Sequence, residues 1–235
     1  MSRTIAVFGA GSGLGTAVAR RFGADGYRVA LIARREGPLA DLAARLTAEG
    51  VEAAALPADL GRPEDIPALV NRIRERFGRI DVVTYAPYDG RAFTPAADLT
   101  PDALRPLTDV MVHGLVQVVH EVLPEMIDRG DGVILAAGGG SALTGLPHMS
   151  GMGPAMAGAR NYLQSLHAEV AGKGVYVGAL YVTAVIENSA AHQTTFNHPE
   201  FRHLPVVSPG ELADALAEMS VKRDPFERVL PGMPV

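Results

Sequence analysis

The chain has 235 residues, of which 48% are hydrophobic and 20% charged, and its 21 Lys and Arg against 26 Asp and Glu give a net charge of −5. This composition excludes a disordered chain, and the length allows a full hydrophobic core. The absence of cysteine excludes disulfide scaffolds and cysteine-ligated zinc. Basic residues are interleaved with acidic ones, so no nucleic-acid partner is expected.

No stretch of the sequence resembles a membrane span or a secretory leader. The first apolar run, 5–8, ends at once in Gly9, and the longest run, 174–186, is shorter than the roughly 20 residues that a span needs. We therefore expect a cytoplasmic protein without a membrane partner.

Short β-branched runs alternate with stretches of helical period, which is typical of a parallel sheet covered by helices on both faces. Strands are expected at 4–8, 28–33, 52–56, 80–85, 132–137, 175–182 and 227–230. Helices are expected at 13–24, 38–49, 63–77, 101–127, 151–171 and 210–220. The pattern predicts one α/β domain over 1–235, a Rossmann-type doubly wound three-layer sandwich with a seven-stranded parallel sheet.

The region 183–209 has no strong periodicity and is interpreted as a loop. A loop of this length in a compact domain is usually functional or mobile. We expect it to contact the substrate.

A glycine-rich segment, Gly9-Ala10-Gly11-Ser12-Gly13-Leu14-Gly15, follows the first predicted strand and opens the first predicted helix. Glycines in this context allow a tight turn and let backbone N–H groups approach a pyrophosphate at the positive end of the helix. Because strand, loop and helix agree, a dinucleotide site is favoured over a purely structural turn.

The end of the second predicted strand indicates which dinucleotide is bound. An NAD site has an acidic residue there for the ribose 2′-hydroxyl, whereas this sequence has Ala33 followed by Arg34 and Arg35. Guanidinium groups bind phosphate bidentately, so NADP(H) is favoured, with Arg34 as the main 2′-phosphate ligand. The alternative, two solvated arginines at a helix start, opposes the helix dipole.

The order and spacing of these motifs resemble the short-chain dehydrogenase/reductase family along nearly the whole chain. Gly9, Gly13 and Gly15 match its TGxxxGxG fingerprint, with Phe8 in place of the Thr, and 123–126 resembles its LPxM helix end. The resemblance implies an oxidoreductase that acts on a small-molecule substrate. It also implies that the protein assembles as a homodimer or homotetramer.

The family also has a strand end that contacts the adenine ring, which Asp59 and Leu60 resemble. The motif and the resemblance together predict the cofactor-binding residues Gly9, Gly11, Ser12, Gly13, Leu14, Gly15, Arg34, Arg35, Asp59 and Leu60.

The residues that transfer a proton in this family are absent. The family uses a Tyr and a Lys one helical turn apart, with a Ser and an Asn, and tyrosine is a useful acid at neutral pH only beside a cation. The matching positions are occupied by Met152, Met156, Gly139 and Met111. The register of bacterial enoyl reductases moves the Tyr position to Met149 and leaves the Lys position unchanged. A thioether neither gives up a proton nor holds a charge.

Met149, Met152 and Met156 are most simply interpreted as an apolar stripe that makes the nicotinamide pocket apolar. The replacement proton donor is sought first at His148, since histidine donates near neutral pH, although a solvated loop histidine is the alternative. Further candidates for this donor, several of them at strand ends, are Tyr85, Tyr181, Tyr88 and His113.

No metal site is expected, because His113 and His120 have no carboxylate at ligand spacing between them. The leading hypothesis is an NADP(H)-dependent oxidoreductase acting on a small, largely apolar activated alkene, imine or carbonyl. Losing a general acid costs about 10²–10⁴ in rate, which is tolerable where the acceptor needs little protonation. The alternatives are a redox-inactive NADP(H)- or metabolite-binding regulatory protein and a non-redox cyclase or isomerase.

Overall fold

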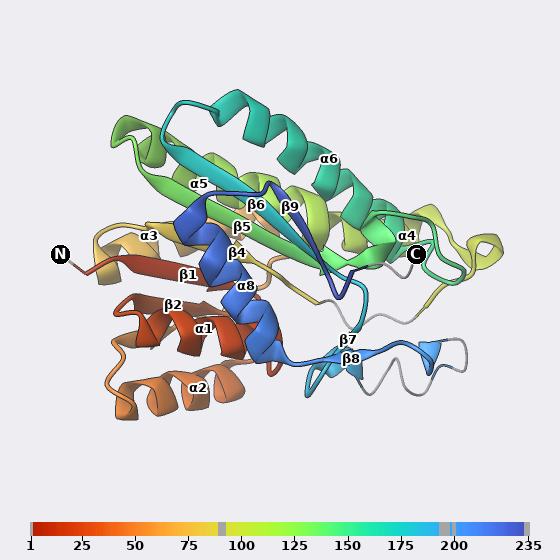
Figure 1. Cartoon of the computed structure of the whole chain (residues 1–235), viewed down its shortest axis with the longest axis horizontal. Helices are drawn as coiled ribbons and strands as arrows, with labels where there is room; N and C mark the ends of the chain where they lie inside the picture. The colour runs from red at the N-terminus through yellow and green to blue at the C-terminus, as the bar shows by residue number, and fades with distance from the viewer. Residues whose placement is uncertain (1, 89–92, 193–197, 199–200, 233–235) are drawn as a thin grey trace.

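The computed structural model describes residues 2–88, 93–192, 198 and 201–232. Its main sheet has seven parallel strands in the order β3-β2-β1-β4-β5-β6-β9, as Figure 1 shows. The strands are β1 (Thr4–Phe8), β2 (Arg28–Ile32), β3 (Ala53–Ala55), β4 (Val82–Tyr85), β5 (Gly132–Gly139), β6 (Val175–Val182) and β9 (Glu227–Leu230). This order confirms the predicted doubly wound α/β fold with a seven-stranded parallel sheet.

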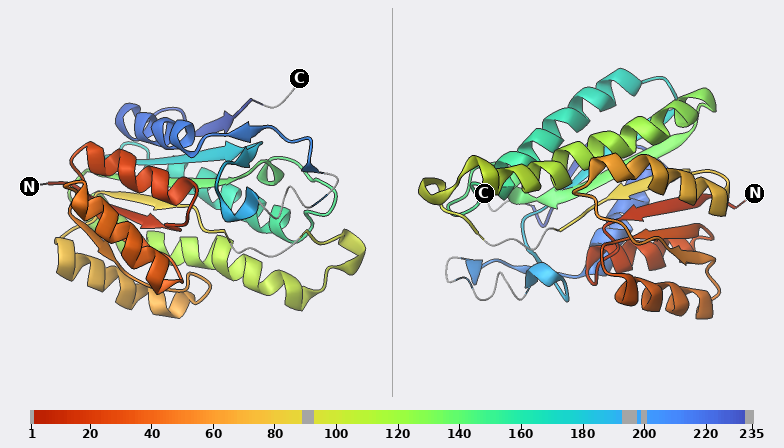
Figure 2. Two further views of the ribbon diagram at one scale, coloured as in Figure 1. Left: turned by 90° about the horizontal axis from the view of Figure 1, so that it is seen from below. Right: turned by 180° about the vertical axis from the view of Figure 1, so that it is seen from behind.

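Helices cover both faces of the sheet, which explains why β1, β4 and β6 are buried along their whole length. The helices are α1 (Leu14–Ala24), α2 (Glu36–Ala48), α3 (Ile66–Phe77), α4 (Pro101–Thr108), α5 (Gly114–Asp128), α6 (Met152–Val170) and α8 (Pro209–Lys222). One core lies under α1, α2 and α8, and the other under α3, α5 and α6 (Figures 1 and 2). The three layers therefore follow directly from the alternating pattern.

The helix predicted at 101–127 is interrupted, which the sequence pattern did not reveal. A π-helical turn, η3 (Asp109–His113), separates α4 from α5. The hydroxyl of Tyr85 donates a hydrogen bond of 2.5 Å to the Val110 carbonyl in this turn. A π-turn contains one extra residue, and this bond gives a displaced carbonyl a partner.

The same stretch is the one described helix, Pro101–Asp128, that is long and apolar enough to cross a membrane by length and composition. Of its most apolar window, 44% is buried inside the protein. A core helix of a soluble protein passes the same test, so this is weak evidence for a span.

The region 183–209 is not a loop throughout, so that prediction was wrong in part. It contains β7 (Val185–Ile186) and β8 (Val206–Val207), which pair in parallel as a separate two-stranded sheet beyond the ends of the main strands (Figure 1). Two-residue strands are too short to produce a detectable period. Residues 193–197 and 199–200 of the region lie outside the described residues.

Candidate active site

A cavity of about 960 Å³ opens at the carboxyl ends of the strands. Its walls come from the segments that follow β1, β2, β3, β4 and β5, together with the start of α6 and part of the region 183–209. Ligands of open α/β sheets bind in this crevice, where the strand order reverses between β1 and β4. We call the part whose lining residues fall within 9–16, 33–45 and 58–60 the cofactor end, and the part lined by Tyr88, by Phe93 and Thr94, and by members of 137–156 and 201–204 the reaction end.

The glycine-rich segment makes a turn that only glycine permits. Gly9 has a positive φ of 102°, and its N–H and that of Ala10 both donate to the Ile32 carbonyl at 2.9 Å. A Cβ on Gly9 would lie 2.5 Å from the Ala86 carbonyl oxygen, and one on Gly15 would lie 2.2 Å from the Gly9 oxygen. These glycines therefore hold the turn in its shape.

The other two glycines of the segment border open space or the opposite wall. A Cβ on Gly11 would meet no atom within 4 Å, while one on Gly13 would lie 2.7 Å from Cβ of Ser189. Gly13 is the N-cap of α1 and has no side chain to cap it, so the first N–H groups of the helix are available to a ligand. The cradle fits a pyrophosphate group.

The predicted adenosine ligands gather at the cofactor end. Arg34 and Arg35 are exposed on its rim, and Asp59 and Leu60 line it from the segment after β3. Asp59 Oδ1 accepts the Gly61 N–H at 3.0 Å. Sequence reasoning missed Arg45, which also lines the cavity. Arg45 lies on the same face of α2 as Pro38 and Leu42, and the helical spacing of these three positions would have identified it from the sequence.

The reaction end is lined by sulfur and aromatic side chains. Met149, Met152 and Met156 all face the cavity, as the stripe predicted. The Met156 sulfur accepts the Gly139 N–H at 3.3 Å and lies 3.8 Å from the Ser141 hydroxyl, which donates to it. The thioether thus engages polar groups of the β5 end directly.

Met111, which the sequence resemblance assigned to the position of the family Asn, is absent from the described lining of the cavity. It is buried in a small core with Leu107, Val110 and Ala155. Its neighbour Val110 does reach the cavity wall. The π-turn therefore forms part of the cavity wall through Val110, whereas Met111 packs in the core behind that wall.

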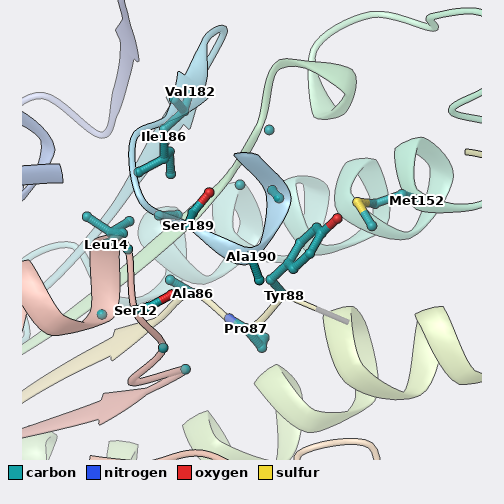
Figure 3. Close-up of a pocket in the computed structure, with 18 of the residues that line it drawn as sticks. Ser12, Leu14, Ala86, Pro87, Tyr88, Met152, Val182, Ile186, Ser189 and Ala190 are labelled. Atoms are coloured by element: carbon teal, nitrogen blue, oxygen red, sulfur yellow. The ribbon is translucent and has the colours of Figure 1, made fainter. Parts of the chain in front are cut away.

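Two of the candidate proton donors line the cavity, His148 and Tyr88. Figure 3 shows the Tyr88 hydroxyl pointing toward the Met152 side chain, with Ala190 beside the ring. His148 has a left-handed backbone with φ of 60°, and its carbonyl accepts the Thr94 N–H at 2.6 Å. A non-glycine residue in this region is uncommon and often marks a functional site.

The structure places the other candidates away from the described lining. Tyr85 and Tyr181 are buried on the face of the sheet that α5 and α6 cover, and burial raises the pKa of both hydroxyls far above the usual range. The Tyr181 ring lies 5.9 Å from the Arg160 guanidinium. Because their pKa values are raised, neither tyrosine is suited to give up a proton near neutral pH. The remaining candidate, His113, is exposed, with Nδ1 2.8 Å from the Asp109 carboxylate.

Charge is distributed unevenly along the cavity. Among the described lining residues, Arg34, Arg35, Arg45 and Asp59 all belong to the cofactor end. Among the described lining residues of the reaction end, His148 is the one histidine, and none is Lys, Arg, Asp or Glu. The cavity can hold a polyanion at one end and an uncharged or cationic group at the other.

Known proteins of similar sequence span several activities. A putative ketoacyl reductase of Streptomyces coelicolor is 31% identical over 182 residues, which are 76% of this chain and 69% of that protein. A peroxisomal 2,4-dienoyl-CoA reductase of Arabidopsis thaliana is 29% identical over 137 residues, or 58% of this chain and 46% of the reductase. The match thus spans less than half of that reductase.

Among solved structures, a short-chain dehydrogenase from Sphingobium yanoikuyae in complex with NADPH superimposes with a TM-score of 0.84 and 29% identity. The match covers 99% of this chain and 89% of that one. The family model for short chain dehydrogenases matches residues 3–197. Together with the sheet order and the glycine-rich turn, this match shows that the chain belongs to the short-chain dehydrogenase family.

Proposed function

We propose that the protein is an NADP(H)-dependent oxidoreductase with an atypical active site, acting on a small, largely apolar activated alkene, imine or carbonyl. The observation that carries the proposal is one continuous cavity that joins the glycine-rich cradle and its arginines to a pocket of thioethers and aromatic rings. The related dehydrogenase that holds NADPH supports the choice of cofactor.

The residues of the cofactor end are assigned as follows. N–H groups of 12–15 bind the pyrophosphate at the start of α1, while the Gly11 N–H donates to the Gly9 carbonyl within the turn. Arg34, with Arg35 beside it, binds the 2′-phosphate, since guanidinium matches phosphate geometry. Asp59 accepts a hydrogen bond from the adenine amino group, and Leu60 packs against the ring.

NADP(H) held at the cofactor end would supply the hydride, and the chain supplies the surroundings. Met149, Met152 and Met156 exclude water and keep the substrate flat against the cofactor site. Where the reduced atom needs a proton, His148 donates it from the imidazolium nitrogen, with the Tyr88 hydroxyl as the nearest alternative. A chain without the Tyr and Lys of its family is expected to turn over acceptors that need little protonation.

Calorimetric titration with NADPH and NADH tests the cofactor, and NADPH oxidation with a substrate panel tests the reaction. We expect tighter binding of NADPH, measurable turnover of an activated alkene or imine, and negligible turnover of simple ketones and secondary alcohols. The double change Met152→Tyr with Met156→Lys is not expected to restore ketone reduction, because Gly139 and Met111 leave the relay incomplete. Equal affinity for both cofactors, or ready ketone reduction, contradicts the proposal.

A second function, an NADP(H)-binding protein without turnover, is favoured by one observation. The Ser141 hydroxyl donates to the Met156 sulfur, so it is not directed at a substrate oxygen. Tight NADPH binding with no oxidation by any acceptor of the panel would establish this second function in place of the first.

The proposal also includes a cytoplasmic location and a homodimer or homotetramer, both carried over from the sequence. Light scattering of the purified protein after gel filtration measures the assembly, and a monomer would remove that part.

A further inference from the structure

The reaction end differs from its family in electric charge as well as in proton donors. Met156 stands where the family has a lysine, and its sulfur is held by the Gly139 N–H and the Ser141 hydroxyl. Within the described lining, the remaining side chains of this end are neutral except for the titratable His148. At the reaction end, therefore, the described lining holds no fixed positive charge that would repel a cation.

Aromatic rings and thioethers form the walls where such a cation would lie. The rings of Phe93 and Phe201 stack with centroids 4.4 Å apart, and Tyr88 lies in the same cavity beside Met152 (Figure 3). Aromatic faces attract cations, most strongly when water is excluded, and sulfur is polarizable. These walls can replace part of the hydration of a flat organic cation.

The charge balance of the reaction distinguishes the substrate classes. Hydride transfer to a neutral carbonyl would leave a negative oxygen beside a positive nicotinamide, and that oxygen would need a proton from His148 or Tyr88, since the described lining of this end holds no fixed positive charge to stabilise it. Hydride transfer to an iminium ion only moves one positive charge from the substrate to the nicotinamide. No proton is required, so the absent Tyr and Lys are not needed.

We propose that the substrate is a cyclic or N-substituted iminium ion, bound as a cation between the thioethers and the aromatic walls. This inference rests on the proposed NADP(H)-dependent function. In the step, a C–H bond of NADPH breaks and a C–H bond forms at the iminium carbon. The electron pair of the C=N π bond becomes a lone pair on nitrogen. The products are a neutral amine, which is tertiary when the iminium nitrogen carries no hydrogen, and NADP⁺, so atoms, electrons and charge balance.

Matched bicyclic probes test this substrate class at pH 8, with the uncatalysed rate subtracted. The N-methyl-3,4-dihydroisoquinolinium ion is a permanent cation, 3,4-dihydroisoquinoline needs a proton to become one, and 1-tetralone is a ketone of the same size. We expect kcat/KM for the N-methyl ion to exceed that of 1-tetralone at least 100-fold at pH 8 and not to fall between pH 6 and 9, because this ion needs no proton. The rate with dihydroisoquinoline should fall as pH rises.

A binding measurement without cofactor gives a readout that is independent of turnover. Calorimetry at pH 8 compares the N-methylisoquinolinium ion with neutral isoquinoline. We expect the cation to bind at least tenfold more tightly. Equal affinity, or tighter binding of the neutral ring, overturns the inference.

The variant Met156→Lys returns the positive charge of the family to the reaction end. We expect it to lower both kcat/KM for the N-methyl ion and affinity for the N-methylisoquinolinium ion at least tenfold. Met156→Leu removes the sulfur without adding charge and should have the smaller effect. Val221→Lys adds the same charge at a side chain that is 80% exposed and remote from the cavity lining, and serves as the control. If Met156→Lys melts below the assay temperature, the binding comparison in the unmodified protein decides.

The outcomes separate this inference from the function beneath it. Faster reduction of 1-tetralone or of a neutral activated alkene than of the N-methyl ion overturns the iminium assignment and keeps the oxidoreductase. NADPH binding without reduction of any probe overturns both the iminium assignment and the redox function. Absence of NADPH binding overturns the cofactor proposal as well.

Discussion

The two ends of the cavity are built from different materials. The cofactor end is made largely of backbone, where the turn at Gly9 approaches the Ala86 carbonyl so closely that a Cβ would lie 2.5 Å from its oxygen. The reaction end is made of side chains, and Met156, which the sequence comparison assigns to the position of the family lysine, projects into it from α6 and contacts the end of β5. A binding site formed by backbone groups depends on the fold itself. A site formed by side chains can change its chemistry through substitutions that leave the fold unchanged.

The largest expected effect comes from filling the cradle. Gly13→Val should weaken binding of NADPH and NADH at least 100-fold, because its Cβ would lie 2.7 Å from Cβ of Ser189 and its methyl groups would enter the pyrophosphate space. Calorimetry measures the affinity. Gly145→Val is the matched control, since a Cβ there meets nothing within 4 Å. Wild-type affinity of Gly13→Val for NADPH would show that the cradle does not hold the cofactor.

Arg34→Ala should separate the two cofactors. Loss of a charge-assisted phosphate contact of about 1.5–3 kcal/mol corresponds to a roughly 10–150-fold weaker affinity for NADPH, and NADH should change little. Arg72→Ala removes an exposed arginine of α3, away from the cavity lining, as a control. An equal loss for both cofactors would mean that Arg34 stabilises the loop and does not read the 2′-phosphate.

His148→Ala probes the reaction end. With a neutral imine as the substrate, turnover should fall at least tenfold while NADPH affinity is unchanged, because the imine then lacks its protein donor. The N-methyl iminium should be affected far less. Full activity of the variant with the neutral imine would transfer the donor role to Tyr88 or water.

Tyr85→Phe should act mainly on stability. It removes the buried hydroxyl that donates to the Val110 carbonyl, and an unsatisfied buried acceptor costs about 1–3 kcal/mol. Urea unfolding measures the loss, with Tyr27→Phe as control, since that hydroxyl makes only an exposed contact of 3.5 Å with Arg3. A tenfold fall in turnover without a change in stability would instead support the catalytic role considered from the sequence.

Much of the fold was predictable because it depends on local patterns. All seven predicted strands and six predicted helical regions have counterparts, and the glycine-rich turn lies where the motif indicated. The pair β7 and β8 was missed because each strand is two residues long. The contact between Gly13 and Ser189 joins distant parts of the chain, and no local pattern encodes it.

The reaction end was less predictable, because sequence gives the place of a residue along a strand more readily than its environment. Tyr85 and Tyr181 do end strands at the carboxyl edge, as expected. Alternation along each strand directs both side chains into the core under α5 and α6. The Met156 sulfur, by contrast, meets the N–H of Gly139, a residue 17 positions earlier in the sequence at the end of β5.

The π-helical turn at Asp109–His113 makes the cavity wall sensitive to chain length. Removing one residue from this turn would join α4 and α5 into a regular helix and rotate the first part by about 100° against the second. Leu107 would then leave its place beside Ala155 of α6. A single deletion, with no change of residue type at the pocket, would thus reshape where a substrate rests.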